Sequence, residues 1–202
     1  MQIVGKVSKM KALPGFCFDI IANLFYSKEI KELIKREINP ATGLNLLDAP
    51  CGTGTLFDIC KPCNYTGIDI DKNRVLKAQD RYAGGKFLVS DASNLPFPEK
   101  KFDLILAAGL FHHVDDECSI KILSEFSRVL KPTGRIIVFE AIWPLHRYNI
   151  VGYLARKMDQ GRFVRYCEGY ENLFKKYFHI QVRYFPSRLG LDYFLTALVL
   201  RE

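Results

Sequence analysis

Strand-like and helix-like patterns alternate along the chain from Leu44 onward. Some apolar runs are unbroken, as in Leu104–Ala108 and Ile136–Phe139, which is typical of parallel strands covered by helices on both faces. Between these runs, apolar residues recur as on one side of a helix, and Pro or Gly often follows. The pattern predicts strands at 44–49, 64–70, 86–90, 102–108 and 134–140, and helices at 54–60, 72–82 and 117–130.

The pattern changes at both ends of this core. Apolar residues within Phe16–Glu37 have the spacing of one or two amphipathic helices, so residues 1–40 are predicted to form a helical cap. Residues 143–158 and 168–177 are also expected to be helical, within an insertion spanning 141–178 on the acceptor side. Strands are predicted at 178–185 and 191–200, and the connection between them is too short for a parallel crossover. The chain is therefore expected to form one α/β domain, a parallel sheet closed by an antiparallel hairpin.

Length and composition are compatible with one sizeable core, since 49% of the 202 residues are hydrophobic. No uncharged apolar run approaches the roughly 18–20 residues of a membrane span, so no transmembrane segment is expected. Lysines interrupt the apolar residues of Met1–Lys11, which argues against a signal peptide. A cytoplasmic location is the resulting expectation.

The net charge of +7 is concentrated late in the chain. Residues 141–188 hold nine Lys or Arg and three acids, a balance that suits an anionic substrate, a nucleic acid, an anionic membrane surface or a solvated face. If a helix starts near Trp143, residues 143, 150, 151, 154 and 158 form one apolar stripe, with Arg147 inside it. Arg147, Arg162 and Arg165 are candidate ligands for an acidic or sugar-linked substrate.

Cys60 and Cys63 have the spacing of a redox or zinc pair, but no second pair accompanies them. They also fall at a predicted joint between a helix and a strand, where Pro62 is expected. A structural or incidental role is therefore favoured, and no metal site is predicted.

The most specific signal is a small-residue turn after the first strand. Leu46–Leu47 leads into Asp48-Ala49-Pro50-Cys51-Gly52-Thr53-Gly54, and a second strand ends in Asp69, fifteen residues after Gly54. A glycine turn followed by an acid about 20 residues later is how open α/β sheets hold a nucleoside. The turn lacks the G-x-G-x-x-G spacing expected of a nicotinamide oxidoreductase.

Further motifs follow in order: Gly67-Ile68-Asp69-Ile70, Ser90-Asp91-Ala92, Phe102-Asp103-Leu104-Ile105 leading into Phe111-His112-His113-Val114, and Leu130-Lys131-Pro132-Thr133-Gly134-Arg135. Together with the glycine turn, they resemble the class I S-adenosylmethionine-dependent methyltransferases, especially the small-molecule branch, over residues 44–140. The resemblance implies a Rossmann-like, seven-stranded, mostly parallel sheet and S-adenosylmethionine as cofactor. Pro50 departs from the pattern, because the family usually has glycine there and proline offers no amide.

The resemblance also implies roles for individual residues. Asp69 would bind the ribose diol, Ile70 would pack on adenine, and Asp91 with the Ala92 amide would bind the adenine edge. Asp48 and the amides around Gly52 and Gly54 would face the methionine moiety, whose ammonium would meet carbonyls near Ala107 and Ala108. As an alternative, Asp69 and Asp91 could simply cap helices, as Asp71 is expected to do. The full expected set is Asp48, Ala49, Gly52, Gly54, Asp69, Ile70, Asp91, Ala92, Ala107 and Ala108.

His112 and His113 follow the fourth strand at its carboxyl end, so either could be a general base, or a histidine that shapes the wall. The expected function is methyl transfer to a small-molecule acceptor, such as a hydroxyl of a sugar, a lipid-linked compound or a secondary metabolite. The alternatives are an RNA-modifying methyltransferase and a non-catalytic cofactor-binding scaffold. Ala107-Ala108-Gly109-Leu110 lacks the Asn/Asp-Pro-Pro-aromatic signature of adenine and glutamine N-methyltransferases. The acceptor and the oligomeric state are left open.

Overall fold

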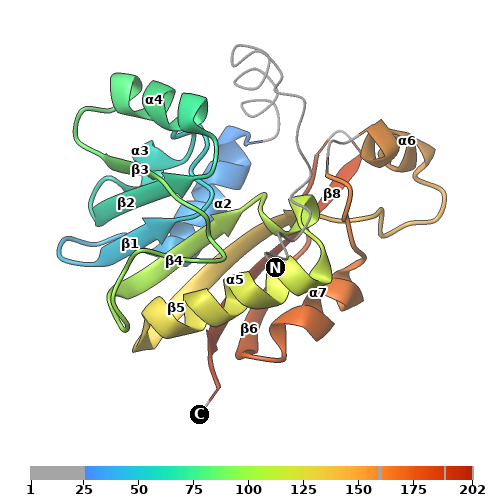
Figure 1. Cartoon of the computed structure of the whole chain (residues 1–202). Coiled ribbons are helices and arrows are strands. Elements are labelled where there is room, and N and C mark those ends of the chain that lie inside the picture. The colour runs from blue at the N-terminus through green and yellow to red at the C-terminus, as the bar shows by residue number, and fades with distance from the viewer. Residues whose placement is uncertain (1–25, 159–160, 189, 202) are drawn as a thin grey trace, which may run out of the picture.

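A single twisted sheet carries the fold in the computed structural model, which describes residues 26–158, 161–188 and 190–201 (Figure 1). Its strands follow the order β3-β2-β1-β4-β5-β8-β6, and the two-residue β7 pairs with β8. Strands β3, β2, β1, β4 and β5 are parallel to one another. The strands are β1 Asn45–Asp48, β2 Asn64–Asp69, β3 Lys86–Val89, β4 Phe102–Ala108, β5 Leu130–Ala141, β6 Phe178–Tyr184, β7 Ser187–Arg188 and β8 Leu191–Leu200.

The last two long strands reverse the direction of the sheet. β8 inserts between β5 and β6 and is antiparallel to both. The predicted Rossmann-like sheet with a C-terminal antiparallel hairpin is therefore confirmed, and the described residues add β7 to the seven strands expected.

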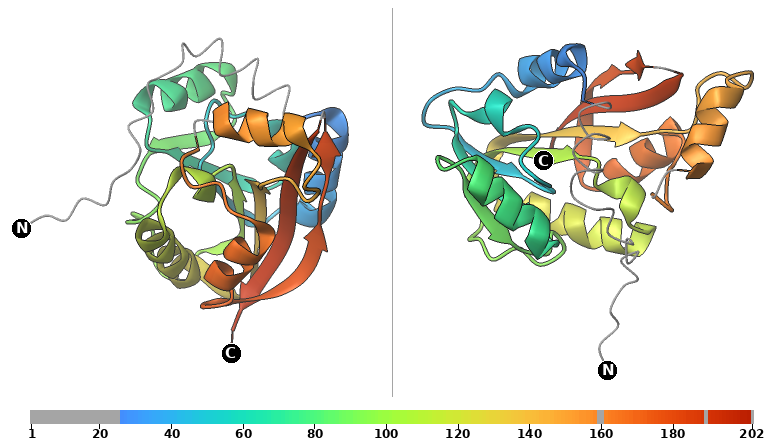
Figure 2. Two further views of the ribbon diagram at one scale, coloured as in Figure 1. Left: turned by 90° about the vertical axis from the view of Figure 1, so that its right-hand side faces the viewer. Right: turned by 90° about the horizontal axis from the view of Figure 1, so that it is seen from above.

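Helices cover both faces of the sheet, with α2 on one side and α5 on the other in the view from above in Figure 2. Three of them begin at a side-chain cap, because Ser27, Asp71 and Asp115 each accept a backbone N–H of the first turn. Asp71 thus has the capping role expected from the sequence. The helices are α2 Lys28–Ile38, α3 Phe57–Cys60, α4 Lys72–Arg81, α5 Asp116–Val129, α6 Ile150–Met158 and α7 Cys167–Phe174, with a 3-10 turn η1 at Phe111–His113.

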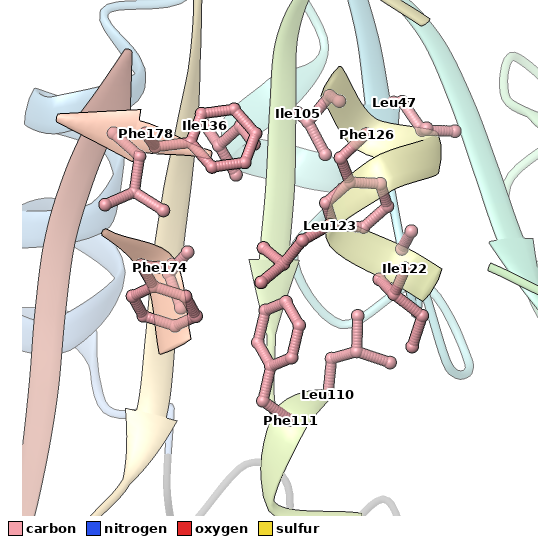
Figure 3. Packing of buried hydrophobic residues seen from close by; sticks show 14 of the residues in the cluster. Leu47, Ile105, Leu110, Phe111, Ile122, Leu123, Phe126, Ile136, Phe174 and Phe178 are labelled. Carbon is pink, nitrogen blue, oxygen red and sulfur yellow. The ribbon is translucent and has the colours of Figure 1, made fainter. Parts of the chain in front are cut away.

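Alternate strand residues fill two separate hydrophobic layers, as period-2 geometry requires. Leu47 and Ile105 point to the layer that α5 and α7 cover, whereas Leu46 and Leu104 point to the layer of α2, α3 and α4. Aromatic rings bind the first layer together, since the ring of Phe111 lies 6.5 Å from that of Phe126 and 5.2 Å from that of Phe174 (Figure 3). The turn that follows β4 is thereby anchored in the core.

Two predicted helices begin later than expected. The helix predicted at 54–60 begins only at Phe57, because Gly52 and Gly54 have φ of 53° and 80° and form a turn. The helix predicted at 143–158 begins at Ile150, so a start near Trp143 was wrong. The amide of Leu145 donates instead to Asp192 Oδ2, at 2.9 Å. Residues 16–25 of the predicted N-terminal helices lie outside the described residues.

None of the helices in the described ranges combines the length and apolar character that a bilayer crossing would require.

Candidate active site

Four buried strands end at one edge of the sheet, and each brings a candidate site residue there. Asp48 ends β1, Asp69 ends β2, Ala108 ends β4, and Glu140 is the penultimate residue of β5. In parallel sheets of this kind the carboxyl edge is where ligands bind. The expected site residues Asp48, Asp69 and Ala108 therefore share this edge of the sheet with Glu140.

The glycine turn is tied to the end of β2. The amide of Gly52 donates to Asp69 Oδ2 at 3.0 Å, and the amide of Asp71 donates to Asp69 Oδ1 at 2.9 Å. The amide of Gly54 donates to the carbonyl of Cys51 at 2.9 Å. Both amides expected to face the methionine moiety are thus used within the protein. Asp69 braces the turn, and each of its oxygens keeps a lone pair for a further donor.

Asp69 is buried, and burial raises the pKa of its carboxyl, whereas the Asp71 amide, Arg74 and the Gly52 amide lower it. The amide donors favour the charged form that a ribose diol would meet.

Asp48 is 1% exposed and only half satisfied. Its Oδ2 accepts the hydroxyl of Tyr65 at 2.7 Å, whereas Oδ1 is buried without a hydrogen-bond partner. Burial raises the pKa of Asp48 to about 7, and the charge of Asp69 adds to the rise. An orphaned carboxylate oxygen at the carboxyl edge is suited to a cationic or N–H donor from a ligand.

The elevated pKa of Asp48 predicts a pH-dependent cost to the free protein. Because the folded pKa lies above the ordinary value of 3.8, the contribution is favourable when the carboxyl is protonated and is lost as pH rises from about 4 to about 7. Asp48→Asn is therefore expected to stabilise the free protein at pH 8 by up to about 4 kcal/mol, and by far less at pH 4. Urea unfolding at both pH values measures this, with the exposed Asp58→Asn as control. A D48N variant less stable than wild type at pH 8 would contradict it.

The three residues expected around the adenine are exposed to solvent, fully or in part. Ile70 follows β2 and is 56% exposed, a large apolar side chain available to pack on an aromatic ring. Asp91 is exposed, and its Oδ1 accepts both the amide and the hydroxyl of Ser93 at 2.8 Å. Ala92 is partly exposed, whereas Ala49, Ala107 and Ala108 are buried.

Glu140 is a further candidate site residue, and the sequence pattern did not single it out. It is fully buried, and its Oε1 accepts the amides of Leu110 and Phe111, each at 2.7 Å. Its Oε2 accepts the amide of His112 at 3.3 Å and lies 2.6 Å from His112 Nδ1. An apolar run that ends in a single acid, Val138-Phe139-Glu140, is the same signal that marked Asp48 and Asp69.

This carboxylate fixes the state of His112. Because Glu140 accepts backbone amides through both oxygens, Nδ1 is the donor in the pair, and Nε2 is the ring nitrogen that Glu140 does not engage. The Cε1 atom of His112 and the Oη atom of Tyr26 lie 3.4 Å and 3.5 Å from where a Cβ on Gly109 would be. The imidazole and the phenol therefore converge on the backbone just after β4.

Tyr26 and His113 complete this corner. Burial, followed by the charges of Glu140 and Asp48, raises the pKa of Tyr26 well above its ordinary value, so the hydroxyl stays protonated. Burial lowers the pKa of His113 to about 2, with His112 and Arg74 adding to the effect. His113 is thus neutral at physiological pH, and its Nδ1 is buried without a hydrogen-bond partner.

The three candidate substrate arginines have different surroundings. Arg165 is an internal clamp, because its guanidinium donates to Asp116 Oδ1 and to the carbonyls of Phe111, Phe163 and Val114. With every donor engaged, its expected role as an anion ligand is not supported. Arg147 is exposed and donates to Tyr148 Oη at 2.5 Å, and Arg162 is exposed.

The residues present fit the expected nucleoside cofactor. A diol would find the carboxylate of Asp69, an adenine would find the exposed Ile70, and an ammonium would meet the orphaned oxygen of Asp48. Pro50, in a cis peptide with Ala49, removes one amide from the turn but leaves these groups in place.

Sequence comparisons with known proteins find methyltransferases. Residues 47–138 match the family model described as "Methyltransferase domain". A ubiquinone/menaquinone biosynthesis C-methyltransferase of Paraburkholderia phytofirmans is 30% identical, over 85% of this chain and 79% of its own length. A demethylmenaquinone methyltransferase of Thermotoga maritima is 35% identical over 59% of this chain.

Other matches are shorter or show the fold alone. A tRNA (carboxymethyluridine(34)-5-O)-methyltransferase of Arabidopsis thaliana is 32% identical over 50% of this chain. The match covers 51% of the Thermotoga maritima relative and 24% of the Arabidopsis thaliana relative. Among solved structures, the PH0226 protein of Pyrococcus horikoshii has a TM-score of 0.71 at 19% identity and covers 98% of this chain and 94% of its own.

Proposed function

Because this chain belongs to the class I S-adenosylmethionine-dependent methyltransferases, we propose that it transfers a methyl group to a hydroxyl-bearing small-molecule acceptor. The cofactor supplies a methyl group on a sulfonium, which a nucleophile must approach in line. The observation that carries the proposal is the buried pair of Glu140 and His112, whose 2.6 Å contact holds the imidazole beside Gly109.

The residues of this chain divide the work. Asp69 and Ile70 would hold the nucleoside, and Asp48 would meet the ammonium. His112 Nε2 would take the proton of the acceptor hydroxyl as the oxygen–methyl bond forms and the carbon–sulfur bond breaks, its electron pair going to sulfur. The insertion at 141–178 would cover the acceptor, since Phe163 donates its amide to the carbonyl of His112 at 3.0 Å. Alignment and water exclusion supply roughly 7–11 kcal/mol in such reactions, and a general base adds about 10²–10⁴-fold.

An RNA acceptor is the second candidate, favoured by the basic residues of 141–188 and by similarity to tRNA methyltransferases over half of the chain. Part of that positive charge is neutralised within the protein, because Arg165 pairs with Asp116 and Arg183 pairs with Glu171. This favours the small-molecule acceptor.

One experiment separates the candidates. The protein is incubated with methyl-labelled S-adenosylmethionine and with host metabolite, lipid and RNA fractions, and binding of S-adenosylhomocysteine is measured by titration calorimetry. We expect cofactor binding and label in a small-molecule fraction. Label only in RNA would support the second candidate, binding without turnover would indicate a scaffold, and tight NADH binding without S-adenosylhomocysteine binding would overturn the proposal.

A further inference from the structure

Helix α6 has its apolar and polar sides reversed relative to an ordinary surface helix. Ile150, Val151 and Leu154 are 67%, 65% and 58% exposed, although their spacing puts them on one side of the helix. The opposite side carries Arg156, which is 4% exposed. An apolar helix face that points to solvent indicates that something else covers it in use.

Polar contacts with the body hold α6 in this orientation. Arg156 Nε donates to the carbonyl of Ile142 at 3.0 Å, and its Nη2 donates to the carbonyl of Asp192 at 2.7 Å. Its guanidinium also lies 4.9 Å from the ring centroid of Tyr193. Gly152 passes close to the carbonyl of Gly190, where a Cβ would clash. Because the inner face is fixed by a buried arginine and a glycine, the helix cannot roll its apolar side inward without leaving that charge unpaired.

The exposed apolar residues continue beyond α6 itself. Six of the ten large hydrophobic side chains that are exposed in the described part of the chain fall within 145–166. Helix α6, which carries three of them, stands at the periphery of the molecule, at the upper right of Figure 1. Ile150, Val151 and Leu154 belong to α6, Leu145 and Tyr148 precede it, and Tyr166 follows it.

Basic residues lie within this surface and close to it in the sequence. Arg147, Lys157 and Arg162 are exposed, and the sequence from 141 to 165 contains one acid, Asp159, which lies outside the described residues. Exposed aliphatic side chains flanked by lysine and arginine are the combination that binds an anionic bilayer surface, with the apolar side chains in the headgroup boundary and the cations on the phosphates. This charge complementarity favours a bilayer over a neutral apolar protein partner.

We propose that the α6 surface, defined as Leu145, Arg147, Tyr148, Ile150, Val151, Leu154 and Lys157, docks the protein on an anionic lipid bilayer. Residues that follow α6 closely in the sequence contact the candidate active site, because Gly161 packs against the ring of His112 and the amide of Phe163 donates to the carbonyl of His112. Docking would therefore bring the lipid surface to the acceptor side of the molecule. The proposal does not depend on methyl transfer.

Co-sedimentation with vesicles tests the proposal. Vesicles of phosphatidylcholine with about 30 mol% phosphatidylglycerol are expected to bind the protein at least about tenfold more strongly than phosphatidylcholine alone, and high salt should reverse the difference. The double variant Val151→Glu/Leu154→Glu should lose this binding by at least about tenfold. Arg147→Ser/Lys157→Ser should weaken it by roughly 25-fold.

Leu76→Glu is the matched control, because Leu76 is also an exposed leucine on a helix, 45% exposed on α4. It should leave vesicle binding unchanged. All variants are checked for S-adenosylhomocysteine binding, so that loss of docking is distinguished from loss of the fold or of the cofactor site. The proposal is overturned if anionic vesicles bind no better than neutral ones or if L76E has the same effect as V151E/L154E. It is also overturned if sedimentation velocity shows that V151E/L154E dissociates a dimer while vesicles bind neither form.

Discussion

Replacing His112 by glutamine is expected to lower kcat for methyl transfer by about 10²–10⁴-fold while S-adenosylhomocysteine binds with unchanged affinity. The reason is that a glutamine amide cannot take the acceptor proton, which is the role proposed for Nε2 of His112. Single-turnover transfer of labelled methyl to the acceptor found by fractionation measures the effect.

Glu140→Gln tests whether the carboxylate acts through His112. A glutamine side chain cannot accept from His112 Nδ1 and from the buried amides together without facing one of them with its own NH₂ group. We expect kcat to fall by about 10²-fold or more, the stability to fall by about 1–3 kcal/mol, and the H112Q/E140Q double variant to be no slower than H112Q alone.

Glu125→Gln provides the control for this pair. Glu125 also accepts a backbone amide, that of Leu95 at 2.7 Å, and pairs with Arg128, but it lies on α5 away from His112. It should lower stability and leave kcat unchanged. A kcat that H112Q leaves intact, with the acceptor known, would contradict the assignment of His112 as the base and leave it the role of shaping the wall.

Asp69→Ala is expected to weaken S-adenosylhomocysteine binding by at least about 100-fold, because charge-assisted hydrogen bonds contribute about 1.5–3 kcal/mol each. Two effects combine: the ribose loses its proposed carboxylate, and the glycine turn loses the contact between Gly52 and Asp69. Titration calorimetry measures the loss.

The two effects can be separated with a modified ligand. In the wild type, the 2′,3′-dideoxy analogue of S-adenosylhomocysteine should bind at least about tenfold more weakly than the parent compound, whereas D69A should bind both equally. Asp71→Ala is the control, since Asp71 caps α4 by accepting the amide of Asn73 at 2.8 Å. It should cost about 1 kcal/mol of stability and leave affinity unchanged. If D69A still distinguishes the two ligands, the ribose is held elsewhere and Asp69 only braces the turn.

The regular elements could be predicted from sequence wherever burial sets the pattern. Unbroken runs such as Leu104–Ala108 and Ile136–Phe139 became strands covered on both faces, and the short link between 185 and 191 gave the antiparallel pairing of β6 with β8. The prediction failed at 143–149. The apolar spacing there is helical, but the amide of Leu145 donates a hydrogen bond to the carboxylate of Asp192, 47 residues away. Local pattern carries no information about such a distant acceptor.

In the candidate site, too, the sequence predicts what depends on neighbouring residues and misses what depends on distant ones. The small-residue turn and the acids that end β1 and β2 are local signals, so Asp48 and Asp69 could be named from the chain alone. Glu140 ends a strand in the same way, yet its importance comes from contact with Leu110, Phe111 and His112, about 30 residues earlier in the sequence. Arg165 looked available for a substrate because the carbonyls of Phe111 and Val114, which accept its hydrogen bonds, lie 54 and 51 residues earlier in the sequence.

The sequence by itself determined the order of the elements, the small-residue turn after β1 and the family to which the chain belongs, because each rests on hydrophobic spacing or on residues a few positions apart. Only the tertiary structure decided which polar groups pair across the sheet. In the folded protein, Glu140 pairs with His112 and with the turn after β4, and one oxygen of Asp48 has no hydrogen-bond partner. The apolar side of α6 faces outward because Arg156, on its opposite side, is buried. These outcomes depend on which groups are desolvated together, and burial is a property of the assembled sheet and helices.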